Sequence, residues 1–159
     1  MAMDFKKIEK KWQVKWEKAK IFEANVNPKK EKYFFTVPYP YASGPAHVGH
    51  GRTYTLGDVT ARFLRMKGFN LLWPLAWHIT GTPVLAISKR IGNGERNIIE
   101  EHKEYVSLHK PKDTEKIVET FVKPENVANF YASVWINDIK ELGCSVDWRR
   151  QFTTGEDVY

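Results

Sequence analysis

Two histidines carry the strongest chemical signal of this 159-residue chain. His47 and His50 stand in the string Ser43-Gly44-Pro45-Ala46-His47-Val48-Gly49-His50, where a loop leads into a helical pattern. On the first turn of a helix, both imidazoles point the same way and can donate hydrogen bonds to one phosphoryl group. Helix amino termini also favour phosphates through free N–H groups. The motif therefore predicts a nucleotide site whose donors stabilise the charge that spreads over the equatorial oxygens of the phosphorus during the reaction.

A zinc site or a dinucleotide-binding fold explains the histidine pair less well than a nucleotide site at a helix amino terminus. Zinc is disfavoured because HExxH spacing is absent and Cys144 is the only cysteine, so no metal site is predicted. A dinucleotide fold is disfavoured because Gly49-His50-Gly51 is followed by Tyr54 where GxGxxG needs a third glycine. A pair of core histidines stays open as an alternative. In the nucleotide interpretation, Gly49 lets adenine approach the backbone closely.

The elements around the histidines follow a strand–helix–strand pattern. Residues 33–37 are aromatic and β-branched throughout, which predicts a strand buried on both faces within a parallel sheet. A helix is predicted over residues 47–67, and a strand-like run over residues 69–74. The inner face of that helix is expected to be apolar, formed by Leu56, Val59, Phe63 and Met66. This order predicts an α/β fold whose ligands bind at the carboxyl ends of the strands.

Helical periodicity also marks both flanks of this unit. From Asp4 as the N-cap, apolar residues recur at three- and four-residue steps as far as Ala19, which predicts an amphipathic helix with an aromatic packing face. Further helices are expected over residues 82–91 and 127–142. Residues 95–116 are charge-rich and weakly periodic, so helical pieces and loops are expected there.

The composition excludes several classes of protein. Hydrophobic residues make up 42% of the chain and aromatic residues 14%, which is typical of a packed globule rather than a disordered segment. No signal-type or membrane-spanning apolar stretch is indicated, and a single cysteine suits a reducing cytoplasm. The net charge of +6 favours a polyanionic partner, but it equally suits the charged surface of a protein from a heat-adapted organism.

Four segments resemble the first half of the class I aminoacyl-tRNA synthetases, whose HIGH-type motifs bind ATP. The segments follow one another in the same order as in that family. They are IEKKWQVKWEKAKIFE, VPYPYASGPAHVGH, GRTYTLGDVTARFLRMKGFNLLWPLAWHITGTPV and LGCSVDWRRQFTT. PYPYASG and WHITGTP are similar to the leucyl members of archaeal and eukaryotic type. The resemblance implies an amino-terminal helical segment over residues 1–32, the first half of a Rossmann-like catalytic domain over 33–154, and a tail or artificial joint over 155–159.

The same resemblance implies the residues of an active site. ATP, with Mg²⁺ bound to it, would be held by His47, Gly49, His50, Gly81 and Thr82, with the two histidines catalytic. The amino-acid pocket would be lined by Tyr39, Tyr41 and His78, although ordinary loop packing is the alternative for the tyrosines. His78 would lie near the substrate ammonium, where bacterial relatives usually have Asp, and an imidazole accepts from an ammonium only when neutral.

The implied activity is ATP-dependent activation of leucine and its transfer to tRNA(Leu) in the cytoplasm. The remaining part of the synthetase would be a partner, because these 159 residues hold no KMSKS-type lysine loop, anticodon-binding domain or editing insertion. The chain alone is therefore expected to bind ATP weakly and not to charge tRNA. The alternatives are a stand-alone HxGH nucleotidyltransferase, an isoleucyl or valyl type fragment, and a non-catalytic nucleotide- or RNA-binding fragment. Arg149 and Arg150 would either face tRNA or form a solvated surface pair.

Overall fold

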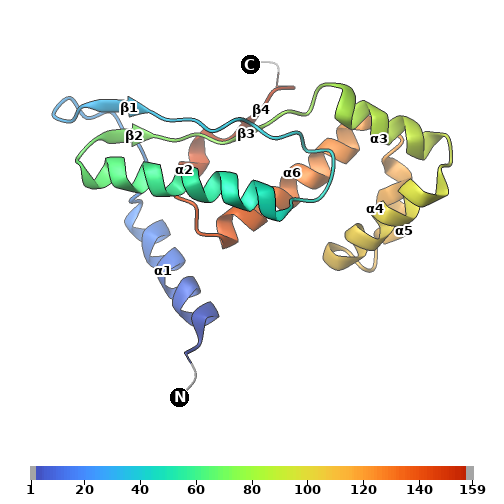
Figure 1. Cartoon of the computed structure of the whole chain (residues 1–159), viewed down its shortest axis with the longest axis horizontal. Coiled ribbons are helices and arrows are strands. Elements are labelled where there is room, and N and C mark those ends of the chain that lie inside the picture. The colour runs from blue at the N-terminus through green and yellow to red at the C-terminus, as the bar shows by residue number, and fades with distance from the viewer. Residues whose placement is uncertain (1–2, 157–159) are drawn as a thin grey trace. The chain divides into compact units, whose positions relative to one another are not determined.

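The structure is a computed structural model that describes residues 3–156 (Figure 1). Its helices are α1 Phe5–Ala19, α2 Val48–Met66, α3 Thr82–Gly92, α4 Arg96–His109, α5 Thr114–Thr120 and α6 Pro124–Glu141. Its strands are β1 Lys32–Phe34, β2 Asn70–Leu72, β3 Ala76–Trp77 and β4 Phe152–Thr153, and a short 3₁₀-helix covers Trp148–Arg150.

The chain folds into two compact units built from alternating segments. The first unit contains the residues up to Val37 together with Gly49–Leu75 and Ile139–Gln151. The second unit contains Pro38–Val48, Ala76–Asp138 and the residues from Phe152 onward. Each unit has its own pair of parallel strands, which confirms the predicted α/β class with parallel pairing.

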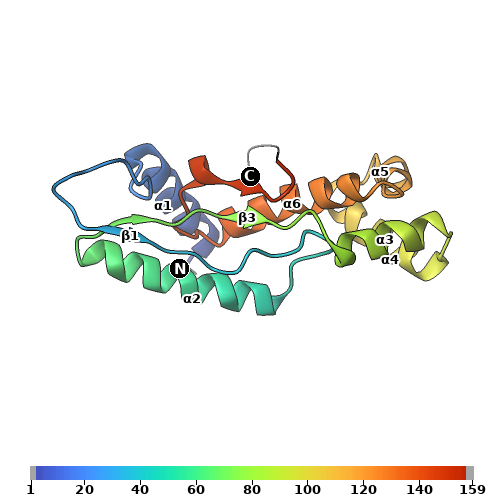
Figure 2. The same ribbon diagram turned by 90° about the horizontal axis from the view of Figure 1, so that it is seen from above.

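The first unit is built around the predicted strand–helix–strand pattern. β1 pairs in parallel with β2, with Tyr33 opposite Leu71, and α2 joins the two strands and runs alongside β1 in both views (Figures 1 and 2). α2 approaches the strands through Gly57, where an added Cβ would lie 2.7 Å from Cγ2 of Val37. A glycine is therefore required at this contact, because any side chain would push the helix away from the sheet.

The expected inner face of α2 is wrong. The buried residues of α2 are Tyr54, Gly57 and Ala61. The four apolar residues assigned to the core are 58–86% exposed, namely Leu56, Val59, Phe63 and Met66. Two of the three buried residues are small, and small side chains permit close packing of a helix on strands. The large apolar side chains consequently lie on another face.

The strand prediction for residues 33–37 is also only partly correct. β1 covers Lys32–Phe34 and all three of its residues are exposed, so the expected burial on both faces is wrong for this stretch. Val37 is the buried member of the run. Within residues 3–156, β1 pairs with β2 alone, which leaves its second edge without a strand.

Within the first unit, the segment that follows α6 is held by polar contacts with α2 and with Trp73. The N–H of Asp147 donates to the carbonyl oxygen of Trp73 at 2.9 Å, and the N–H of Ser145 donates to the Asp58 carboxylate at 2.6 Å. Arg62 donates to the carbonyl oxygen of Gly143 at 2.7 Å and forms an ion pair with Asp58. Charge-assisted bonds of this kind are stronger than neutral ones, so they anchor a segment that has no strand partner of its own among the described residues.

Helix α1 belongs to the same unit. The Asp4 carboxylate accepts a hydrogen bond from the N–H of Lys7 at 3.0 Å and so caps the first turn. At its other end, Trp16 packs against Phe22 and lies under the Arg62 guanidinium, which is 4.6 Å from the ring centroid. The apolar residues nearer the amino terminus, Phe5, Ile8 and Trp12, are exposed.

The second unit joins strand pairing to a helical core. β3 pairs in parallel with β4, with Ala76 opposite Phe152. The helices α3–α6 enclose an aromatic cluster in which Phe121, Tyr131 and His102 contact one another. Burial lowers the pKa of His102, whose Nδ1 is hydrogen-bonded to the Tyr131 hydroxyl. His102 is therefore a neutral core histidine at physiological pH.

Candidate active site

The extended segment at residues 39–42 lies beside His78. The N–H of His78 donates to the carbonyl oxygen of Pro40 at 2.9 Å, and the N–H of Ala42 donates to the carbonyl oxygen of His78 at 3.3 Å. These bonds bring the Tyr41 ring to 5.1 Å from the His78 ring, and the Tyr39 ring to 6.2 Å. The three residues predicted to line the amino-acid pocket are thus neighbours, although they come from distant parts of the sequence.

Gly81 completes this cluster. Its φ of 117° lies in the region that favours glycine, and an added Cβ would lie 3.2 Å from Cε1 of Tyr41. It is also the N-cap of α3, with Thr82 as the first helical residue and Pro83 in the first turn. The local sequence explains the turn, because glycine permits this backbone and proline suits the start of a helix. Gly81 therefore lets the chain turn into α3 while it stays against the Tyr41 ring.

The histidine pair lies at the start of α2. His47 directly precedes Val48, the first residue of the helix, and is exposed, whereas His50 is half-buried within the first turn. Gly49 between them is exposed. His47 belongs to the second unit, together with the tyrosines, His78, Gly81 and Thr82, while Gly49 and His50 belong to the first. The amino terminus of a helix carries a partial positive charge that suits an anion, and the histidine motif lies at that end of α2.

A buried tryptophan from α6 holds the loop that leads to the histidines. The indole Nε1 of Trp135 donates to the carbonyl oxygen of Gly44 at 2.9 Å, and Trp135 is 2% exposed. Periodicity predicts Trp135 to lie on a helix but gives no sign of its partner, which lies 91 residues away. Trp135 is thus a site-supporting residue that the sequence pattern did not reveal.

Residues in and next to β4 also support the site, and the sequence pattern did not identify them. The Phe152 ring meets the Tyr39 ring edge-on at a centroid distance of 5.4 Å. The Thr154 hydroxyl accepts from the N–H of Ile79 at 3.3 Å, and the N–H of Thr154 donates to the carbonyl oxygen of Trp77 at 3.0 Å. The only available signal was the family-like string that ends in QFTT. Strand β4 therefore supports the His78 segment.

Arg149 is committed to contacts within the first unit. It forms ion pairs with Asp147 at 2.8 Å and Glu23 at 3.2 Å. Burial by itself raises the pKa of Asp147, but hydrogen bonds from Arg149 and from the N–H of Ala24 outweigh it, so the net pKa lies below its ordinary value. Of the two arginines in the DWRR string, Arg149 thus has a structural role, while Arg150 is exposed.

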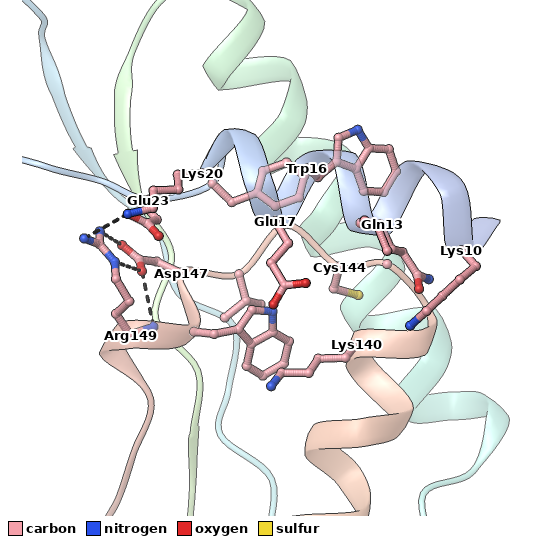
Figure 3. Close-up of a pocket in the computed structure, with 15 residues that line it drawn as sticks. Lys10, Gln13, Trp16, Glu17, Lys20, Glu23, Lys140, Cys144, Asp147 and Arg149 are labelled. Carbon is pink, nitrogen blue, oxygen red and sulfur yellow. Dashed lines mark hydrogen bonds and ion pairs between the residues drawn. The ribbon is translucent and has the colours of Figure 1, made fainter. Parts of the chain in front are cut away.

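A cavity of about 540 Å³ lies elsewhere in the first unit, between α1 and residues 140–149 (Figure 3). Its walls include Trp16, Trp148 and Lys140, and the Lys140 ammonium is 5.0 Å from the Trp148 ring centroid. The Cys144 thiol also lines it, and burial raises the pKa of that thiol to about 12. The cavity contains none of the predicted site residues, and such a thiol is not a reactive nucleophile at neutral pH.

The described residues offer neither a cluster of metal ligands nor a membrane span. Among residues 3–156, no three His, Cys, Asp or Glu side chains gather into a group that could hold a metal ion. No helix in the described part of the chain is long and apolar enough to cross a membrane.

Comparison with known proteins identifies the family. A leucine–tRNA ligase of Staphylothermus marinus is 53% identical over 154 residues, which cover 96% of this chain and 16% of that protein. A leucine–tRNA ligase of Thermoplasma acidophilum is 44% identical over 152 residues, which cover 96% and 17%. This chain therefore spans about one sixth of the length of these relatives.

A solved structure and a family profile agree with these relatives. The crystal structure of a LeuRS–tRNA–LeuAMS ternary complex from Agrobacterium radiobacter K84 shares the fold with a TM-score of 0.76 at 22% identity, covering 99% of this chain and 17% of that one. The profile of the class I tRNA synthetases for isoleucine, leucine, methionine and valine matches residues 11–158. The match spans nearly the whole sequence, and the chain belongs to the class I tRNA synthetases of this group.

Proposed function

We propose that this chain supplies the HIGH-motif half of an enzyme that activates leucine with ATP and transfers it to tRNA(Leu). The observation that carries this proposal is the cluster in which Tyr39, Tyr41 and His78 are held together by the strand-like pairing of two distant segments. The similarity to archaeal leucine–tRNA ligases supports leucine as the amino acid. Cytoplasmic location belongs to the same proposal, since charged tRNA serves translation.

In the proposed reaction, a carboxylate oxygen of leucine attacks the α-phosphorus of ATP. The bond between that phosphorus and the oxygen bridging to the β-phosphate breaks, and pyrophosphate leaves with the electron pair. His47 and His50 would donate hydrogen bonds to the non-bridging oxygens as charge grows on them. Donors that act mainly at this stage raise the rate more than they raise the affinity for ATP.

The amino-acid pocket would use aromatic walls and one imidazole. Tyr39 and Tyr41 are rigid rings that suit an aliphatic side chain, and the Phe152 ring extends the same wall through its contact with Tyr39. His78 would accept a hydrogen bond from the leucine ammonium in its neutral form. Gly81 supports this arrangement because its lack of a side chain leaves room for the Tyr41 ring.

The residues proposed to bind ATP are His47, Gly49 and His50 at the start of α2, and Gly81 and Thr82 at the start of α3. Mg²⁺ would enter bound to the phosphates of ATP. Magnesium held in this way takes most of its oxygen ligands from the phosphates and from water, so it needs few ligands from the protein.

The remaining part of the synthetase is the proposed partner that completes the fold. The exposed apolar stripe of α2, which comprises Leu56, Val59, Phe63 and Met66, and the unpaired edge of β1 within residues 3–156 both suit burial by further chain. In this proposal, β1 becomes an inner strand of a Rossmann-like sheet, and α1 becomes an amphipathic helix with its apolar face covered. The domain boundaries proposed are residues 1–32 and 33–154; residues 157–159 of the proposed tail 155–159 lie outside the described residues.

Pyrophosphate exchange with the complete enzyme tests the proposed function. The rate is measured over a panel of amino acids, and leucine is expected to give the highest kcat/KM. One methylene in an apolar pocket is worth only about 1–3 kcal/mol, so slow exchange with valine, which is one methylene smaller, and with near-isosteres such as isoleucine is also expected. Preference for valine, isoleucine or methionine would overturn the leucyl assignment. Exchange with no amino acid, but nucleotidyl transfer to another acceptor, would overturn the synthetase activity itself.

A further inference from the structure

Helix α1 has a continuous stripe of lysines along one side. Lys7, Lys11, Lys15 and Lys18 follow one another at steps of four, four and three residues, and all are exposed. In a helix with 3.6 residues per turn, these steps keep the side chains on one face. The stripe therefore extends over about three turns of α1.

No carboxylate within residues 3–156 forms an ion pair with these four ammonium groups. The lysine ion pairs in this part of the chain are those of Lys103 on α4, and none includes a member of the α1 stripe. Over the same residues, the one ring contact of the stripe is that of Lys15, whose ammonium lies 4.9 Å from the centroid of the Trp12 ring. Four like charges along one face repel one another. Binding of an external anion to the stripe would relieve this repulsion and is therefore favourable.

The other faces of α1 already have separate environments. Lys10, Gln13 and Glu17 point into the cavity of the first unit (Figure 3), and the Gln13 amide donates to the carbonyl oxygen of Glu141 at 2.8 Å. The face with Trp16 packs on Phe22. None of these contacts involves the four lysines of the stripe.

The positive charge of the chain is concentrated in the unit that carries this stripe. The sequence of the first unit has 17 Lys and Arg against 8 Asp and Glu, a surplus of nine positive charges. The second unit has 8 against 11, a deficit of three. The net charge of +6 is therefore the sum of a strongly basic first unit and a weakly acidic second unit. A concentration of positive charge in one unit favours binding of a polyanion.

We propose that the α1 stripe of Lys7, Lys11, Lys15 and Lys18 is a contact surface for the phosphate backbone of RNA. The inference rests on the proposed function in taking tRNA as the RNA, and it adds the surface through which part of that RNA is held. A surface of lysines contributes affinity without base specificity.

A membrane surface is the competing partner for a basic helix with aromatic residues. Such a helix must place its whole apolar face into the lipid. In α1, Trp16 is already engaged with Phe22 and Arg62, and Glu17 and Gln13 line the cavity beside it. This arrangement disfavours lipid and favours RNA.

The test uses the 159-residue chain and a fluorescent tRNA(Leu) transcript, without leucine or ATP. The first variant changes Lys7, Lys11, Lys15 and Lys18 to Gln, which keeps helix propensity nearly unchanged. The matched control changes four exposed lysines of the second unit to Gln, namely Lys89, Lys110, Lys112 and Lys123. A third variant changes the α1 lysines to Arg. The Kd is measured by anisotropy at several salt concentrations, and circular dichroism verifies folding.

The α1 Gln variant is expected to bind at least about 10-fold more weakly at low salt, with a log–log salt slope reduced by about 3, since each lost phosphate contact removes about 0.7 to 0.9. The control and the Arg variant are expected to stay within about 2-fold of the wild type. Equal losses in the α1 and control variants, or no loss in either, would overturn the proposal. Loss of binding to phosphatidylglycerol-containing vesicles with unchanged tRNA binding would overturn it in favour of a membrane. The binding assay involves no aminoacylation. A failure of pyrophosphate exchange would therefore count against the proposed function alone, and a failure of tRNA binding to depend on the α1 lysines would count against the proposed RNA surface alone.

Discussion

The indole of Trp135 donates a hydrogen bond to the carbonyl oxygen of Gly44 at 2.9 Å, and so ties helix α6 to the loop that ends at His47. Trp135 is buried and Gly44 is half-buried, so the hydrogen bond between them is partly shielded from water. The loop before the histidine motif is thus held by a residue that has no chemical role of its own. Its effect on the proposed reaction would be one of positioning.

Changing Trp135 to Phe keeps the aromatic bulk and removes the donor. In the complete enzyme, the single-turnover rate of adenylation is expected to fall by about 2- to 10-fold, which corresponds to the net free energy of one hydrogen bond. The KM for leucine should change little, because the cluster of Tyr39, Tyr41 and His78 is held by backbone hydrogen bonds that do not involve Trp135. Trp148→Phe, in the cavity of the first unit, is the control and should leave the rate unchanged.

Replacing His47 or His50 by Ala tests the proposed catalytic role of the histidines. The adenylation rate of the complete enzyme is expected to fall by on the order of 10- to 1,000-fold, while the Kd for ATP changes little. The physical reason is that donors aimed at developing charge act mainly in the transition state. His109→Ala, an exposed histidine at the end of α4, serves as the control. A large loss of ATP affinity at an unchanged rate is the contrary outcome.

Changing Gly81 to Ala is expected to destabilise the second unit and to displace Tyr41. The positive φ disfavours an L side chain, and the new Cβ would lie 3.2 Å from the Tyr41 ring. The free energy of unfolding, measured in urea, should fall by about 1–3 kcal/mol. Gly92→Ala is the matched control, because nothing lies within 4 Å of its added Cβ and alanine favours a helix. Equal stability of the two variants would contradict the proposed role of Gly81.

The Asp147 carboxylate is expected to make stability depend on pH. Its pKa is lower in the folded protein than in the unfolded chain, so its contribution is present above about pH 4 and is lost as pH falls through the folded pKa. Asp147→Asn should lower the free energy of unfolding at pH 7 by about 1.5–3 kcal/mol. The difference from wild type should shrink on acidification, whereas Asp113→Asn, at an exposed carboxylate, should have little effect. A difference that is constant from about pH 7 to about pH 3 would contradict the assignment.

The sequence by itself determined the limits of the two helices that begin at the site. The helix expected over residues 47–67 is α2 at Val48–Met66, and the helix expected over 82–91 is α3 at Thr82–Gly92. The boundaries were predictable because proline and glycine act locally, as Gly68 does with its φ of 98° after α2. The strings PYPYASG and WHITGTP, which resemble the family, also identified Tyr39, Tyr41 and His78 as candidate site residues. No sequence pattern indicated how far apart these residues lie.

The tertiary structure alone decided which faces are buried and which distant residues meet. Hydrophobic periodicity identifies an apolar stripe but not the surface that covers it: α2 buries Tyr54, Gly57 and Ala61, while Phe63 stays exposed. The partners Trp135 and Gly44, and the ion pair of Arg149 with Glu23, join segments that are far apart in sequence. Contacts of this kind depend on how the chain folds back on itself, and local propensity carries no information about that path.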